Sequence, residues 1–318
     1  MPIKSYPILQ SLIHCIATPI EIKMKANLGK TGVQTYPPIF IIGAPRSGST
    51  LIYKVLADKF NLTFFSNLTA FFYKIPILIA WFEKKIRLKH KKENYDFKYG
   101  DIKGLGAPSE CGEFWYRWFH RGLNVYVAPG QTPVMDLKEL RTEIGGVTEI
   151  SNQPLIIKNL YNSMRIAPIV EAIPEASFII CRRNYTENAL SILKGRINNM
   201  HSKNKWWSLP PKEINHLLSL PWAEQIAGQI HYIYKQIEED KKRFGIDRFF
   251  EIIYEDFCDD VHSSVKRIED FLSARRCYLV KRDVIPKQFH TIRVNGINPK
   301  DRKMVKKAVQ NIIQTKNK

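Results

Sequence analysis

A loop near residue 43 carries the residue types that bind phosphate. Two glycines, Gly43 and Gly48, enclose Arg46 after the apolar run 39–42, and a helical apolar pattern follows. The other polar residues of the loop are also phosphate-contact types: Ser47, Ser49 and Thr50. In strand–loop–helix units with this spacing, backbone N–H groups point at a phosphate on the helix N-terminus. A plain tight turn would need the glycines but none of these polar side chains.

The position of the cation in this loop argues against a nucleoside triphosphate as the ligand. In P-loop kinases, a lysine at the position of Ser49 reaches the β- and γ-phosphates. Here the cation is Arg46, inside the loop. The sequence therefore favours a phosphate-bearing donor other than ATP, with a P-loop nucleotide kinase as the alternative enzyme.

A second strand–turn–helix unit places another arginine at the end of a strand. The apolar residues 178–180 lead to Arg183, and Asn184 with Glu187 has the N-terminal pattern of a capping box. Ser191 lies about two helical turns beyond this cap. Taken alone, Arg183 could be an ordinary solvated arginine at a strand end. A second strand–turn–helix unit in the same chain as the phosphate loop favours a role in binding phosphate instead.

The two units together resemble the sulfotransferases that use 3′-phosphoadenosine-5′-phosphosulfate (PAPS), in particular the bacterial-type branch with a Gly-x-Pro-Arg-Ser-Gly-Ser/Thr-Thr loop. The resemblance implies that residues 43–50 bind the 5′-phosphosulfate and that Arg183 and Ser191 hold the 3′-phosphate. Tyr185 stands where the family usually has Pro, a departure that removes no phosphate contact. The resemblance runs from about residue 38 to about residue 275, and includes a Tyr-Glu-Asp turn at 254–256 with an expected structural role.

Two further matches to this family are short. The strand 155–157 ends in Lys158, which resembles the lysine that the family brings to the reacting sulfate, although Leu160 replaces the usual Pro. The stretch 289–296 resembles the C-terminal loop that brings a basic residue to the 3′-phosphate, here Arg293. The alternative for both is a basic residue on the surface.

Sulfuryl transfer implies both fixed cations and a general base. Charge that builds on the departing 5′-phosphate is offset by cations and N–H dipoles, for which Arg46 and Lys158 are the candidates. The acceptor must also lose a proton to a base within hydrogen-bond reach. Glu110 best matches the acidic motif of related sequences, Glu113 is second, and His120 is third. Glu110 would otherwise cap the following helix, since an acid at a helix start is ordinary.

The elements that carry these residues indicate an α/β fold. Nearly all-apolar strands at 39–42, 155–157, 178–180 and 249–253 alternate with helical stretches, which indicates a parallel sheet covered on both faces. Ligands of such sheets bind at the carboxyl ends of the strands. We therefore expect a three-layer sandwich with a P-loop-like phosphate-binding loop, formed by residues 37–298. Residues 1–36 are an expected N-terminal extension and 299–318 a basic C-terminal tail.

The formal charge of +19 calls for an anionic partner. A nucleic-acid-binding protein is the alternative from another class, but it would leave the two phosphate motifs unexplained. Six Lys and Arg within 84–92 follow an apolar block that begins near residue 70 and is too short to span a bilayer. This segment would lie on a membrane surface, form a lid over the acceptor, or be a buried helix with a polar end.

The rest of the composition bears on the cellular compartment and on metal binding, and not on the type of reaction. Five scattered cysteines form no CxxC pair, which favours reduced thiols and a cytoplasmic protein, with membrane association left open. The eight histidines show no metal-ligand spacing, so we expect no metal site. The sequence does not identify the acceptor, and a small hydroxylated molecule, a carbohydrate and a lipid all fit.

Overall fold

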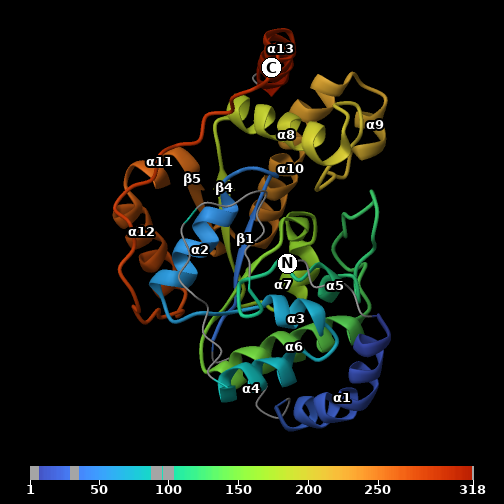
Figure 1. Ribbon diagram of the computed structural model, residues 1–318, viewed down its shortest axis with the longest axis vertical. Helices are drawn as coiled ribbons and strands as arrows, with labels where there is room; N and C mark the ends of the chain where they lie inside the picture. The colour runs from blue at the N-terminus through green and yellow to red at the C-terminus, as the bar shows by residue number, and fades with distance from the viewer. Residues whose placement is uncertain (1–6, 29–35, 87–94, 96–103, 317–318) are drawn as a thin grey trace.

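A five-stranded parallel sheet forms the centre of the molecule (Figure 1). The computed structural model describes residues 7–28, 36–86, 95 and 104–316. The strand order is β2-β3-β1-β4-β5, and neighbouring strands run parallel throughout. The strands are β1 (Ile39–Gly43), β2 (Thr63–Phe64), β3 (Leu155–Lys158), β4 (Ser177–Arg182) and β5 (Phe249–Ile253). The expected α/β architecture with a central parallel sheet is confirmed, and only the two-residue edge strand β2 has no counterpart in the sequence prediction.

Helices cover both faces of the sheet, which explains why the strands are largely apolar. They are α1 (Pro7–Leu28), α2 (Ser49–Lys59), α3 (Asn67–Phe71), α4 (Pro76–Ile86), α5 (Gly112–Trp115), α6 (Val134–Ser151), α7 (Ile166–Ala172), α8 (Tyr185–Met200), α9 (Ile214–Leu218), α10 (Trp222–Phe244), α11 (Tyr254–Asp259), α12 (Val261–Ala274) and α13 (Pro299–Lys316). Two short 3₁₀ helices are η1 (Leu160–Met164) and η2 (Ile246–Arg248).

Alternate residues of β1 enter two separate hydrophobic cores. Phe40 and Ile42 belong to the larger core, which is shared with helices α6, α7, α8 and α10. Ile39 and Ile41 belong to the smaller core, which is shared with α2 and α12. Because successive side chains of a strand point to opposite faces, this division places one helical layer on each side of the sheet. The sheet is thus the rigid middle layer that positions the loops at its carboxyl edge.

Both ends of the described chain form helices that pack on the main body. Helix α1 contacts α4 and α6, and the Glu21 carboxylate accepts the backbone N–H groups of Ile77 (3.0 Å) and Leu78 (2.8 Å) at the start of α4. Helix α13 contacts α8 and α10 and buries Val305 and Val309 in the larger core. Much of the expected extension and of the expected basic tail is therefore packed helix. Of the helices described, none is both long enough and apolar enough to span a bilayer.

The apolar block near residue 70 is divided between the interior and the surface. Ile75 and Ile79 are buried and form a small core with Ala17 of α1. Trp81 and Phe82, one helical turn farther on, remain 45% and 43% exposed. The basic run that follows lies, from residue 87 onward, outside the described residues. The buried-helix alternative therefore holds for the first part of the block and not for its end.

Candidate active site

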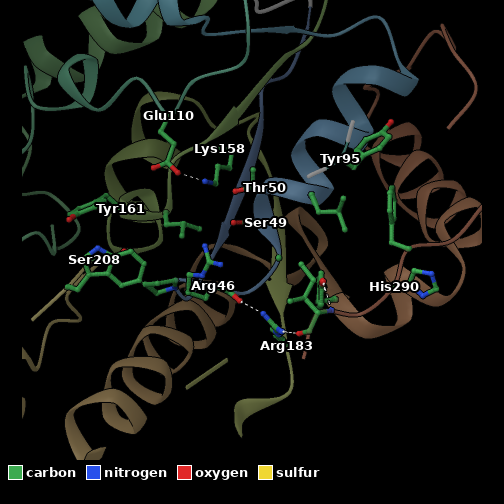
Figure 2. A pocket seen from close by; sticks show the side chains of 18 residues that line it. Arg46, Ser49, Thr50, Tyr95, Glu110, Lys158, Tyr161, Arg183, Ser208 and His290 are labelled. Atoms are coloured by element: carbon green, nitrogen blue, oxygen red, sulfur yellow. Dashed lines mark hydrogen bonds and ion pairs between the residues drawn. The ribbon is translucent and has the colours of Figure 1, made fainter. Parts of the chain in front are cut away.

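A cavity of about 580 Å³ lies at the carboxyl edge of the sheet (Figure 2). Its walls come from the β1–α2 loop, the ends of β3 and β4, the start of α11 and three separate loops. The lining residues are Pro45, Arg46, Gly48, Ser49, Thr50, Leu51, Tyr95, Glu110, Lys158, Leu160, Tyr161, Arg183, Trp207, Ser208, Tyr254, Phe289, His290 and Ile292. The cavity thus collects residues from almost 250 positions of the chain into one site.

The phosphate loop takes a backbone path that only its glycines permit. Gly43 has φ +145°, and a Cβ at this position would lie 2.5 Å from the carbonyl oxygen of Cys181 on the neighbouring strand. Gly48 has φ +90°, and a Cβ there would lie 2.2 Å from the ring of Tyr254. Arg46 itself is left-handed, with φ +66°. Ser49 then starts helix α2, in which the N–H of Leu51 donates to the carbonyl of Gly48 (3.0 Å), while the N–H groups of Ser49 and Thr50 precede this bond.

Arg46 connects the phosphate loop to helix α8. Its Nε donates a hydrogen bond of 3.1 Å to the Oγ of Ser191, and its side chain lines the cavity. Asn188 of the same helix donates 2.6 Å from its side chain to the carbonyl of Pro45. The loop and α8 are therefore held together by two contacts, and the side chains expected to bind the two ends of the donor touch one another.

Arg183 lies at the opposite side of the loop and is nearly buried, with 9% exposure. Its guanidinium donates 3.2 Å to the carbonyl of Arg46 and also donates to the carbonyl of Ile292. It lies 4.8 Å from the centroid of the Tyr254 ring. Its Nε and the Oγ of the buried Ser47 have no hydrogen-bond partner in the described part of the chain. Buried polar atoms without partners are uncommon, and an anionic ligand in the cavity that Arg183 lines would satisfy its Nε.

Glu110 and Lys158 form an ion pair across the cavity (Figure 2). Lys158 ends β3 and its side chain is 5% exposed, whereas the Glu110 side chain is 46% exposed. The side chain of Asn159 donates 3.1 Å to the backbone carbonyl of Glu110, which fixes the glutamate beside the strand end. The following helix is capped at Cys111 without a side-chain hydrogen bond, so Glu110 does not act as its cap.

The charges of the cavity favour an anionic ligand. Among the described residues that line the cavity, the cations Arg46, Lys158 and Arg183 face one carboxylate, Glu110. The phenol of Tyr161, beside Lys158 in the sequence, has a raised pKa because of burial, which Arg165 only partly opposes. It therefore remains a hydrogen-bond donor at neutral pH. No three His, Cys, Asp or Glu side chains of the described residues lie close enough together to hold a metal ion.

The cavity includes most of the expected site residues, but not all of them. Glu113 forms an ion pair with Arg121 at the surface, and both side chains are about half exposed. Arg293 is exposed and does not line the cavity, although its neighbour Ile292 does. His120 is also exposed, and its carbonyl accepts 3.3 Å from Arg165. Gly43, Ser47 and Ser191 do not line the cavity either.

Several lining residues were not expected from the sequence. Tyr254 was assigned a structural role, yet its ring forms part of the wall beneath Gly48. Its position directly after β5 would have revealed it, because all the strands end at this edge. Tyr161 follows Lys158 at the end of β3, so its place at this edge of the sheet could be predicted in the same way. Trp207 comes from the loop between α8 and α9, inside the range 197–225 that the sequence offers, with 65–120, for the acceptor pocket.

Comparison with known proteins places the chain in a family. Residues 37–275 match the model of the Sulfotransferase family, close to the limits of the resemblance noted above. The chain belongs to the sulfotransferase family. It is therefore a transferase of sulfuryl groups, and the cavity at the carboxyl edge of its sheet is the candidate active site of this sulfotransferase.

Curated relatives and solved structures are distant from this sulfotransferase in sequence. The omega-hydroxy-beta-dihydromenaquinone-9 sulfotransferases Stf3 of Mycobacterium bovis and Mycobacterium tuberculosis are each 24% identical over 305 residues, covering 86% of this chain and 74% of theirs. The crystal structure of sulfotransferase STF9 from Mycobacterium avium aligns with a TM-score of 0.49 at 11% identity, covering 94% of this chain and 72% of that one.

Proposed function

We propose that this sulfotransferase moves a sulfuryl group from PAPS to a hydroxyl or amine of its acceptor. The observation that carries the proposal is the convergence of Arg46, Lys158, Arg183 and the phosphate loop on one cavity. The unpartnered Nε of Arg183 supports an anionic ligand in the cavity. Arg46 and the first-turn N–H groups of α2 would bind the 5′-phosphosulfate, while Arg183 and Ser191 would hold the 3′-phosphate.

In this proposal the proton and the leaving group go to opposite sides of the sulfur. The acceptor O–H gives its proton to the Glu110 carboxylate as its oxygen bonds to sulfur. The bond from sulfur to the 5′-phosphate oxygen breaks, and the electron pair leaves on the phosphate. Arg46 and Lys158 stabilise the charge that develops there. The products are the sulfate ester and 3′-phosphoadenosine-5′-phosphate.

The ion pair between Glu110 and Lys158 implies that binding of the proposed donor also releases the general base. Without a ligand, the Lys158 ammonium is neutralised by the Glu110 carboxylate. A sulfate in reach of Lys158 would compete for this ammonium and leave the carboxylate available to the acceptor proton. Glu113, which is paired with Arg121 away from the cavity, is the lesser candidate for the base.

The acceptor that we propose is a hydroxylated, largely apolar molecule. The wall beside Glu110 and Lys158 includes Leu160, Tyr161 and Trp207, which offer apolar and aromatic contact area. The relatives named for a hydroxylated menaquinone derivative act on such a molecule, and this supports the same class here.

Free thiols at all five cysteines support the expectation of a reducing, cytoplasmic setting.

Nucleotide binding provides the direct test of the donor. Added 3′-phosphoadenosine-5′-phosphate should raise the melting temperature, because a ligand that binds only the folded state stabilises it. Adenosine-5′-phosphate at the same concentration should do much less, since Arg183 would have no 3′-phosphate to hold. In an Arg183→Gln variant the two shifts should become similar. Equal shifts by the two nucleotides in the wild type would contradict the donor assignment.

A further inference from the structure

Helix α1 presents a row of exposed apolar side chains to the outside. Ile8, Leu12, Ile16 and Ile20 are 85%, 55%, 67% and 50% exposed. They follow one another at intervals of four residues, so they lie on one side of the helix. Ile22, 58% exposed, is two residues beyond Ile20 and lies on another side of the helix. Soluble surface helices usually turn charged residues outward, and the described part of α1 does the reverse.

The packing of α1 on the body does not explain this outward row. The opposite side of the helix already makes the contacts, through the buried His14, Ala17 and Glu21. Ala17 packs with Ile75 and Ile79 of α4, and Glu21 accepts the first N–H groups of that helix. The fold therefore uses one side of helix α1, and the apolar row on the opposite side has no contact within the described residues that accounts for it. Contiguous exposed apolar surface of this kind marks an interaction site.

The end of helix α4 also exposes apolar side chains. Figure 1 shows α1 and α4 together at one end of the molecule, opposite α13, and the two helices are in contact. Trp81, Phe82 and Ile86 are 45%, 43% and 49% exposed. Tryptophan is favoured at the boundary between water and lipid, because its ring has both an apolar body and a polar N–H group. We call the exposed side chains of α1 and α4 the α1–α4 surface.

The exposed charged side chains on α1 and α4 themselves are all positive, although the neighbouring helix α6 carries the exposed acids Glu139 and Glu149. The described part of α1 and all of α4 contain one acid each, and both acids turn inward. Glu21 caps α4, and Glu83 accepts a hydrogen bond of 2.5 Å from the hydroxyl of Ser66. Three lysines remain exposed on the two helices: Lys23, Lys84 and Lys85. Apolar residues next to lysines, with the acids directed away, complement an anionic lipid headgroup layer.

We infer that the α1–α4 surface docks on the surface of an anionic lipid bilayer. The apolar row of α1 enters the boundary between headgroups and acyl chains, and the lysines contact the headgroups. This differs from the expectation for the segment 70–92, because Ile75 and Ile79 are used to hold α1 in place. None of the residues involved lines the active-site cavity, so the inference stands whether or not the proposed donor and acceptor are right.

Sedimentation of the full chain with vesicles tests this inference. Vesicles of phosphatidylcholine with about a third phosphatidylserine should carry the wild-type protein down, and pure phosphatidylcholine vesicles should carry much less. A Leu12→Glu/Ile16→Glu variant should lose at least about tenfold in binding, since it places charge in the apolar row. The matched control is Ile246→Glu/Val284→Glu, which changes two side chains with 68% and 78% exposure elsewhere and should bind like the wild type.

The lysines give a second, independent comparison. Lys23→Gln/Lys85→Gln should weaken binding to anionic vesicles by about fivefold for each lysine and leave binding to neutral vesicles unchanged. Circular-dichroism melting of every variant establishes that the fold is intact without relying on nucleotide binding. Failure of the wild type to bind anionic vesicles would overturn the inference, as would undiminished binding by Leu12→Glu/Ile16→Glu. A dimer in ultracentrifugation that this variant abolishes, without vesicle binding, would assign the surface to a second copy instead.

Discussion

Arg46 and Ser191 lie 145 positions apart in the sequence, and the Nε of Arg46 donates a hydrogen bond of 3.1 Å to the serine Oγ. The contact joins the phosphate loop after β1 to the helix after β4. Adjacent parallel strands make this possible, because Gly43 of β1 lies in register with Cys181 of β4. A substitution at Arg46 or at Ser191 therefore removes a contact between the two ends of the proposed donor site.

Replacing Arg46 should affect turnover far more than folding. The loss of a cation directed at developing charge typically lowers kcat by ~10²–10³. Steady-state kinetics of Arg46→Ala should show this loss, with a melting temperature close to that of the matched control. Arg276→Ala is that control, because Arg276 is an exposed arginine that also has a positive φ, of 60°. Normal turnover by Arg46→Ala would remove Arg46 from the proposed mechanism.

Glu110→Gln should abolish transfer and leave nucleotide binding intact, because glutamine keeps the shape of the side chain but cannot take a proton. Glu113→Gln should remain active, since Glu113 is paired with Arg121 outside the cavity. Activity assays and thermal shifts with 3′-phosphoadenosine-5′-phosphate distinguish the two steps. If Glu113→Gln is inactive and Glu110→Gln is active, the general base is Glu113.

Gly48→Ala should destabilise the fold by more than a positive φ alone requires. Left-handed backbone costs an alanine about 1–2 kcal/mol, and the new methyl would also overlap the ring of Tyr254. Gly122→Ala is the matched control, since its φ is +93° with no atom within 4 Å of the added carbon. Urea unfolding should therefore give a clearly larger loss for Gly48→Ala. Equal losses would mean that Tyr254 moves aside without cost.

The stability of the contact between α1 and α4 should depend on pH through Glu21. Burial raises the pKa of its carboxyl to about 7 from an ordinary value of 4.5, against the opposing hydrogen bonds from Ile77 and Leu78. The folded state then holds a proton that the unfolded chain releases. The stabilisation is complete below pH 4.5 and is lost as the pH rises through about 7, by about 3 kcal/mol at most.

Urea unfolding at pH 5, 6, 7 and 8 checks this dependence. The difference in unfolding free energy between the wild type and Glu21→Gln should move against the wild type as the pH rises, because glutamine does not titrate. The exposed Glu149 provides a Glu→Gln control in helix α6. A difference that is constant, or that favours the wild type increasingly with pH, would show that burial does not dominate at Glu21.

Local patterns in the sequence were sufficient for the elements that carry the site. The apolar runs predicted four of the five strands, because strands that are covered on both faces consist largely of apolar residues. Asn184 caps α8 as its pattern predicts, accepting 3.2 Å from the N–H of Glu187. The reciprocal half of the capping box is replaced, because the Glu187 carboxylate accepts from the N–H of Val294 instead. That substitution depends on a segment more than a hundred residues away.

What the sequence determined by itself was the phosphate loop, the strands and the family, since these depend on residues close together in the chain. Only the tertiary structure decided which distant side chains share the cavity. Glu110 and Glu113 are three residues apart and chemically alike, yet one pairs with Lys158 in the cavity and the other with Arg121 at the surface. Likewise, the apolar residues of α1 divide between the interior and the outside according to where α4 packs. Both outcomes depend on packing between segments that are far apart in the chain, and this packing cannot be predicted from local sequence patterns.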